Sequence, residues 1–134
     1  MQILVTGVTG LLGNNVVREL LDRQIRPRVL VRETSDSRPL EGLEVDLFYG
    51  DIRDLAAVQA ACKGIDVVIH AAGYVKIGWS DRELHWAINV EGTRNVETAI
   101  DQQKGRLVHV STVNTMGVAA ANQVADEEST KQPI

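Results

Sequence analysis

The sequence predicts an α/β fold built on a doubly wound parallel sheet of about five strands. Short apolar runs alternate with stretches of helical periodicity, which is typical of strand–helix–strand units with right-handed crossovers. The continuous run Val67-Val68-Ile69 indicates a strand that is covered on both faces. A glycine-rich stretch at 7–13 directly follows the first apolar run, as in phosphate-binding turns of such folds. The length of 134 residues fits one domain.

The five expected strands are rich in β-branched and other apolar residues. They fall near Gln2–Thr6, Arg28–Arg32, Val45–Tyr49, Asp66–His70 and Arg106–Ser111. The three expected helices fall near Leu11–Arg23, Leu55–Cys62 and Arg82–Gln102.

In the first helix the apolar residues recur at helical spacing and predict a single stripe on one face. This stripe comprises Leu11, Leu12, Val16, Val17, Leu20 and Leu21. The segment 119–134 is polar and lacks periodicity, so it is expected to be a loop that follows a domain at 1–118.

Composition and charge narrow the class of protein. A net charge of −4 argues against a general nucleic-acid surface, which needs a basic stripe. The single cysteine, Cys62, excludes an internal disulfide and is expected to be a small buried or half-buried residue. No membrane-length apolar stretch or secretory leader is visible, so a cytoplasmic protein is expected. The three histidines have no partner at metal-ligand spacing, so no metal site is expected, and Trp86 is expected to pack against the sheet.

The glycines at 7–13 predict a cradle for a phosphate group. Gly7 would let the chain turn tightly off the strand, Gly10 would leave room for a pyrophosphate, and Gly13 would let the helix approach the strand. The start of the helix offers unpaired N–H groups and the positive end of its dipole to an anion. A dinucleotide cofactor follows, the alternative being a glycine-rich turn with no ligand.

The end of the second strand bears on the choice between NADP and NAD. Binders of NAD usually place an acidic residue there, whereas this sequence has Val31 and Arg32. The planar guanidinium of Arg32 suits a 2′-phosphate, with Ser35 and Arg38 as possible helpers. NADP is therefore favoured over NAD, although two acidic residues nearby weigh against it and Arg32 could instead be a solvated surface residue.

Two other strand ends carry candidate cofactor contacts. Asp51 and Ile52 could flank an adenine, while the alternative for Asp51 is a turn or N-cap residue before the next helix. Small residues at Ala71, Ala72 and Gly73 would let the backbone approach a cofactor, or would serve tight packing at a strand end.

The fifth strand ends in the hydroxyl residues Ser111 and Thr112. Hydroxyls at a strand mouth suit substrate orientation and proton relay. The alternative is ordinary turn chemistry, in which the hydroxyls bond the nearby backbone.

The chain resembles the extended short-chain dehydrogenase/reductases, and more narrowly their NAD-dependent epimerase/dehydratase and dihydroflavonol 4-reductase-like branch. The resemblance spans nearly the whole chain. It is carried by Thr6-Gly7-Val8-Thr9-Gly10-Leu11-Leu12-Gly13, Val31-Arg32, Gly50-Asp51-Ile52, His70-Ala71-Ala72-Gly73, Asn89-Val90-Glu91-Gly92-Thr93 and Val110-Ser111-Thr112.

The resemblance implies a Rossmann-type fold and a role for each matching residue. Gly7, Gly10 and Gly13, with Thr9 in the same turn, would hold the pyrophosphate together with the backbone N–H groups of Leu11 and Leu12. Arg32 would bind the 2′-phosphate, Asp51 and Ile52 would contact the adenine, and Ala71, Ala72 and Gly73 would lie beside the nicotinamide ribose. Asn89 would brace the active site from its helix. Thr112 would be the catalytic hydroxyl, or Ser111 if the register differs by one.

The family's catalytic Tyr-x-x-x-Lys pair is absent, because neither Tyr49 nor Tyr74 has a lysine four residues later. The acidic loop Asp126-Glu127-Glu128 matches the one that precedes this tyrosine in the family. The chain is therefore expected to be the N-terminal portion of a larger enzyme and to be inactive alone. The apolar edge Leu107–Val110 is expected to promote self-association.

Three functions remain open on the sequence. The first is an NADP-dependent oxidoreductase acting on a small carbonyl compound or secondary alcohol. The second is a nucleotide-sugar epimerase or dehydratase that keeps NAD bound. The third is a module that senses the dinucleotide without turnover.

Overall fold

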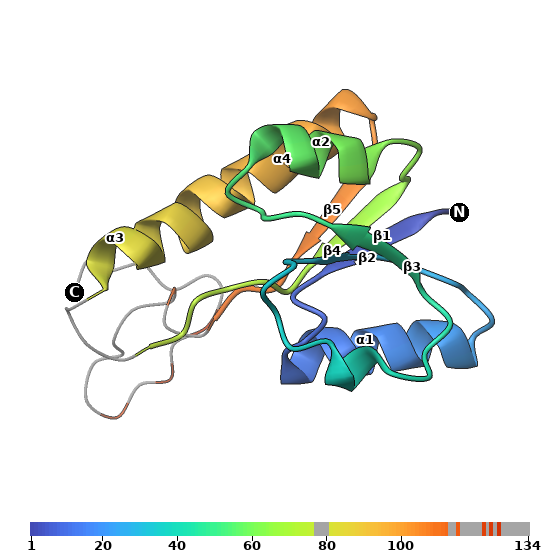
Figure 1. Ribbon diagram of the computed structural model, residues 1–134. Helices are drawn as coiled ribbons and strands as arrows, with labels where there is room; N and C mark the ends of the chain where they lie inside the picture. The colour runs from blue at the N-terminus through green and yellow to red at the C-terminus, as the bar shows by residue number, and fades with distance from the viewer. Residues whose placement is uncertain (77–80, 113–114, 116–121, 123, 125, 127–134) are drawn as a thin grey trace.

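A central parallel sheet organises the molecule, of which the computed structural model describes residues 1–76, 81–112, 115, 122, 124 and 126. The strand order is β3-β2-β1-β4-β5 (Figure 1). The strands are β1 (Ile3–Thr6), β2 (Arg28–Val31), β3 (Asp46–Tyr49), β4 (Val67–His70) and β5 (Arg106–His109). The order reverses between β1 and β4, which is where ligands bind in open α/β sheets. The predicted fold class is confirmed.

Helices cover both faces of the sheet (Figure 1). One face carries α1 (Leu11–Asp22), and the other carries α2 (Leu55–Cys62) and α4 (Thr93–Gln102). A short 3-10 turn, η1 (Arg38–Leu40), follows β2. The helix predicted over 82–102 is present, but it is composite: α3 (Arg82–His85) leads into a π-helical segment, η2 (Trp86–Gly92), before α4 begins.

The central strand shows why its sequence is apolar throughout. Leu4 and Val5 point to opposite faces and both are fully buried, Leu4 in the cluster under α2 and α4 and Val5 in the cluster under α1. A strand covered on both faces needs apolar residues at successive positions rather than alternate ones. Cys62 is buried in the first cluster as predicted, and burial raises the pKa of its thiol to about 11, so it is an unreactive core residue.

Three strands end at the predicted residue (Thr6, Tyr49 and His70), whereas β2 and β5 end before the predicted Arg32 and Ser111. Val31 and His109 are the last residues of these two strands, although the Gly50 N–H still donates to the Val31 carbonyl and the Val110 N–H to the His70 carbonyl just beyond them. The fifth strand lies at the edge of the described sheet, with Val108 47% exposed. Self-association through this edge stays a prediction. Most of the segment 119–134, predicted to be a loop, lies outside the described residues.

Two sequence expectations about packing are wrong. Leu11 and Leu12 are 86% and 50% exposed, because at 3.6 residues per turn they fall outside the face through which the helix is buried, formed by Gly13, Val17 and Leu20. Trp86 is 60% exposed and donates its indole N–H to Glu91 at 3.2 Å, so it does not pack against the sheet.

Candidate functional site

The turn between β1 and α1 depends on its glycines. Gly7 has a φ of +72°, and a Cβ on it would lie 2.5 Å from the Ala71 carbonyl and the Ala72 nitrogen. A Cβ on Gly13 would overlap the Gly7 carbonyl. The Gly10 N–H donates to the Gly7 carbonyl at 3.0 Å, which closes the turn. The expected tight turn at Gly7 and the close helix approach at Gly13 are therefore confirmed.

The start of α1 is suited to binding an anion. Gly10 is the N-cap and supplies no side-chain cap, and the first turn contains no acidic residue. The carbonyl of Gly10 accepts from Asn14, whereas the first N–H groups of any helix have no carbonyl partner within it. These N–H groups belong to Leu11, Leu12 and Gly13, at the positive end of the helix dipole.

A cavity of about 320 Å³ lies at the carboxyl ends of the strands, next to this turn. Nine of the predicted site residues line it: Gly7, Thr9, Gly10, Arg32, Asp51, Ile52, Ala71, Ala72 and Gly73. Six others do not: Leu11, Leu12, Gly13, Asn89, Ser111 and Thr112. The lining also includes Ser35, Tyr74, Leu84 and Ile88.

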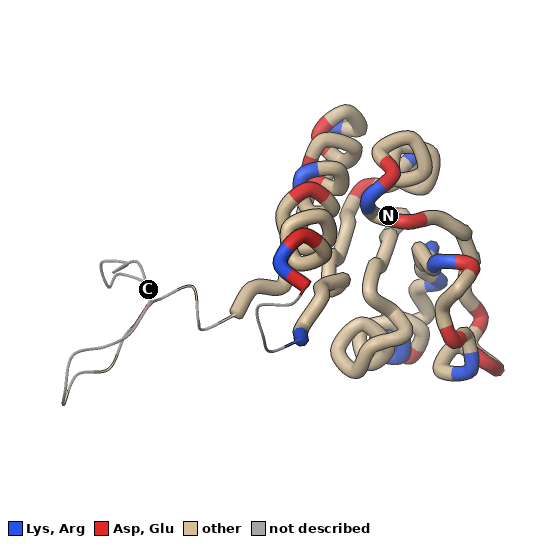
Figure 2. Tube along the Cα trace, turned by 60° about the vertical axis from the view of Figure 1, so that its left-hand side comes forward, with Lys and Arg blue, Asp and Glu red and all other residues tan. Residues whose placement is uncertain are grey.

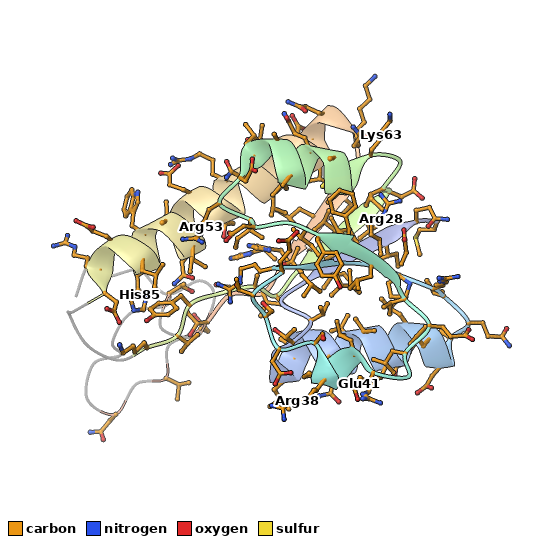
Figure 3. All side chains as sticks on the ribbon, in the orientation of Figure 1. Arg28, Arg38, Glu41, Arg53, Lys63 and His85 are labelled. Carbon is orange, nitrogen blue, oxygen red and sulfur yellow. The ribbon has the colours of Figure 1, made fainter. Side chains whose placement is uncertain are left out.

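The end of β2 brings one cation to the cavity and leaves another outside it. Arg32 lines the cavity with Ser35, whose N–H donates to the Arg32 carbonyl at 2.9 Å. Within the described part of the chain, Arg32 makes no ion pair. Arg38, predicted as a helper, pairs with Asp36 at 2.6 Å and its side chain is 81% exposed. Figure 3 shows Arg38 beside α1 at the outside of the molecule, on the other side of the sheet from Arg53.

Asp51 is held by a bidentate partner that the sequence did not indicate. The Arg53 guanidinium reaches its carboxylate at 2.6 Å, and the Arg53 N–H donates to it at 2.9 Å. These hydrogen bonds, aided by the charge of Arg32, lower the pKa of Asp51 from its usual 3.8. The N-cap of α2 is Asp54, which accepts from Ala56 and Ala57, so Asp51 is not the N-cap. The turn alternative for Asp51 is confirmed, because its carbonyl accepts from the Asp54 N–H at 3.0 Å.

The loop after β4 is clamped to the π segment by Asn89. Its side-chain oxygen accepts from the Tyr74 N–H at 2.7 Å, and its amide nitrogen donates to the Tyr74 carbonyl at 3.0 Å. Asn89 thus braces the loop that lines the cavity, although it does not itself line it. π segments often occur at functional sites.

Ser111 and Thr112 follow the carboxyl end of β5 and are exposed. The Thr112 carbonyl accepts from the backbone N–H and the hydroxyl of Thr115, at 3.1 and 2.8 Å. The structure thus places both hydroxyl residues at the carboxyl edge of the sheet, outside the cavity lining.

Sequence reasoning missed a polar network beneath the site. His70 is fully buried and its ring bonds the hydroxyls of Thr6 at 2.7 Å and Thr93 at 3.1 Å. Desolvation, with a smaller effect of His109 stacked at 5.5 Å, lowers the pKa of His70 to about 4. The sequence did offer one indication, because Thr6 and His70 are the polar last residues of two otherwise apolar strands. In the structure these two residues are paired in register.

Other kinds of site find no support in the described residues. No group of three or more His, Cys, Asp or Glu side chains among them could hold a metal ion. None of their helices combines the length and apolar character needed to cross a membrane. Figure 2 shows acidic and basic positions interleaved along the long helix and the loops, rather than gathered into a basic surface.

Comparisons with known proteins agree with this geometry. The model of the NAD dependent epimerase/dehydratase family matches residues 3–134. Sterol demethylase protein B of Methylococcus capsulatus is 40% identical over 119 residues, which cover 88% of this chain and 36% of that protein. A putative dihydroflavonol 4-reductase of Synechocystis is 38% identical, over 97% of this chain and 38% of that protein. The chain thus spans less than two-fifths of the length of these relatives.

Solved structures give the same result. The crystal structure of gox2253 superposes with a TM-score of 0.88 at 34% identity, over 97% of this chain and 40% of that one. UDP-glucose 4-epimerase of Thermus thermophilus in complex with NAD superposes with a TM-score of 0.87 at 29% identity, over 99% of this chain and 45% of that one. The sheet order, the glycine turn and these matches together show that the chain belongs to the NAD-dependent epimerase/dehydratase family.

Proposed function

We propose that this chain is the cofactor-binding part of an NADP-dependent oxidoreductase that acts on a carbonyl compound or a secondary alcohol. The observation that carries the proposal is the position of Arg32. Its side chain lines the cavity beside the glycine turn, and no described carboxylate lies within ion-pair distance of it. A guanidinium in this setting suits a 2′-phosphate.

The chain's own residues fit the parts of a dinucleotide. The amides at the start of α1 would bind the diphosphate. The glycines at 7 and 13 let the turn pack closely against the neighbouring backbone, because neither carries a side chain that would clash with it. Asp51 and Ile52 would contact the adenine. Ser35 would assist Arg32 at the 2′-phosphate. A bound nicotinamide would supply hydride transfer.

The loop after β4 and the end of β5 would serve the reacting end of the cofactor. The backbone at 71–73 would lie against the nicotinamide ribose, since small residues there leave room for it. Thr112, with Ser111 as the alternative, would hydrogen-bond the oxygen of the substrate and orient it. No Tyr-x-x-x-Lys pair occurs within the 134 residues, so proton transfer is not assigned to a residue of this chain.

A second candidate is an epimerase or dehydratase that retains NAD. The similarity to the Thermus thermophilus UDP-glucose 4-epimerase, solved with NAD, favours it. Val31 disfavours retention of NAD, because binders of NAD usually have an acidic residue at this position for the ribose hydroxyls.

Replacing Arg32 with alanine tests the choice of cofactor. We expect the Kd for NADP to rise roughly 10- to 100-fold, since a hydrogen bond to a charged group contributes about 1.5–3 kcal/mol. The Kd for NAD should stay within about twofold of the parent value, because NAD lacks the phosphate. Isothermal titration calorimetry of both cofactors measures this difference.

Arg38→Ala is the matched control, because it removes the same charge from the same region but outside the cavity lining. It should leave both affinities unchanged. Equal affinity for NADP and NAD, unaltered in Arg32→Ala, would contradict the proposal and favour the epimerase hypothesis. Binding of either cofactor with no turnover by the complete gene product would favour a sensing module.

A further inference from the structure

A chain of hydrogen bonds runs through the buried imidazole of His70, from the central strand to the long helix. On one side, Nδ1 lies 2.7 Å from the hydroxyl of Thr6 at the end of β1. On the other, Nε2 lies 3.1 Å from the hydroxyl of Thr93 at the start of α4. Among the described residues, no buried side-chain nitrogen or oxygen lacks a partner. The network is therefore fully satisfied where it is buried.

The partners fix the direction of each hydrogen bond. The Thr93 hydroxyl donates its only proton to the Asn89 carbonyl at 2.8 Å, so it can only accept from His70. Nε2 of His70 must then carry the proton. With the ring neutral, Nδ1 accepts from the Thr6 hydroxyl. The Thr6 oxygen is left to accept the Ala72 N–H, which lies 3.3 Å away.

Both ends of this hydrogen-bond network lie on the same loop. The Thr6 end holds Ala72, and the Asn89 end holds Tyr74 through two hydrogen bonds. Ala72 and Tyr74 line the cavity, whereas His70 and Thr93 do not. The π segment is part of this network. The backbone N–H of Thr93 donates to the Val90 carbonyl, and the Thr93 hydroxyl donates to the Asn89 carbonyl.

We propose that His70 and Thr93 are positioning residues that hold the loop 71–74 in place as one wall of the dinucleotide site. The inference rests on the proposed function for what the loop contacts, but the positioning itself is a property of the loop. Without the Thr93 hydroxyl, the His70 N–H would be buried and unpaired, and the imidazole would shift or change tautomer. Its hold on Thr6, and through Thr6 on Ala72, would weaken.

The main test compares three variants of α4. Thr93→Val removes the hydroxyl with little change of shape, Thr93→Ser restores it, and Thr98→Val makes the same exchange at an exposed position of the same helix. Amide hydrogen exchange by NMR reports the loop, and calorimetry reports the Kd for NADP and NAD. In Thr93→Val we expect exchange of the Ala72 and Tyr74 amides to speed up roughly tenfold and the Kd to rise roughly five- to tenfold.

The serine variant should restore both values, and Thr98→Val should change neither. Three results would overturn the proposal. Thr93→Val could show the same exchange rates and Kd as Thr98→Val, or its amide exchange could rise equally across β1 and β4. The third is faster exchange of the loop amides with an unaltered Kd, where the parent chain binds the cofactor. If the parent chain binds no dinucleotide, the proposed function fails, and the exchange rates of the loop alone decide the positioning role.

A measurement on the unaltered chain avoids any doubt about folding of a variant. A long-range ¹H–¹⁵N spectrum should give Nε2 of His70 the shift of a protonated ring nitrogen and Nδ1 that of an unprotonated one. The opposite tautomer would break the deduced order of donors and acceptors and would overturn the proposal.

Discussion

Replacing Gly7 with alanine is expected to destabilise the fold by at least about 3 kcal/mol and to abolish dinucleotide binding. The left-handed backbone at φ +72° costs about 1–2 kcal/mol for any residue with a Cβ. The added Cβ would also lie 2.5 Å from backbone atoms of Ala71 and Ala72, which cannot turn aside as the end of a flexible side chain can. Urea unfolding followed by circular dichroism measures the free energy of unfolding.

Gly42→Ala is the control for this experiment. Gly42 has nearly the same φ, +76°, but a Cβ there would meet nothing within 4 Å. The free energy of unfolding of Gly42→Ala should therefore fall only by the cost of the left-handed backbone, about 1–2 kcal/mol. The difference between the variants measures the close approach of the glycine turn to the loop after β4. Equal losses would show that this approach contributes nothing.

Acidification from pH 6.5 to pH 4 is expected to lower the free energy of unfolding by about 3 kcal/mol through His70 alone. Its pKa falls from an ordinary 6.5 to about 4 in the folded protein, because burial disfavours the charged ring. Between these values the unfolded chain binds a proton that the folded chain does not, so stability is full above pH 6.5 and falls as the pH drops. A tenfold difference in proton affinity between the folded and unfolded chain corresponds to about 1.4 kcal/mol.

Urea unfolding at half-unit pH steps measures this slope. Asp36, Asp51 and Asp81 also have lowered pKa values, but they start from 3.8, so most of their effect falls below pH 4. His70→Gln should be less stable at pH 7 and should lose most of the slope between pH 4 and 6.5. An unchanged slope in His70→Gln would contradict the assignment.

The order and type of the elements could be predicted because the sheet is covered on both faces. Strands such as Ile3–Thr6 and Val67–His70 are apolar throughout except for their last residues, and the helices between them show helical spacing. The carboxyl ends of β2 and β5 could not be predicted, since Arg32, Val110 and Ser111 follow these strands without a glycine or proline to mark the end. Periodicity also did not reveal the π segment, because the i→i+5 hydrogen bonds of Trp86–Gly92 occupy only a short stretch within a longer helix.

The glycine turn could be predicted because its geometry admits few other residues. The strand ends predicted Arg32, Asp51 and the loop 71–73, all of which the structure brings to one cavity, and the resemblance added the role implied for each. Long-range partners were beyond reach. Nothing in the spacing indicated that His70 would bond Thr93, 23 residues away. The exposure of Leu11 and Leu12 was missed because the predicted stripe includes them with Val17 and Leu20, although 3.6 residues per turn place Leu11 on nearly the opposite side of the helix.

The proposed function depends most on a dinucleotide diphosphate binding at the start of α1. Titration of the ¹⁵N-labelled chain with NADP, followed by two-dimensional NMR, tests this most directly. We expect the largest shift changes at the backbone amides of Gly10, Leu11 and Leu12, with smaller ones at Arg32 and in the loop 71–73. Amide signals at 10–12 that stay in place while NADP binds elsewhere, or does not bind, would contradict it.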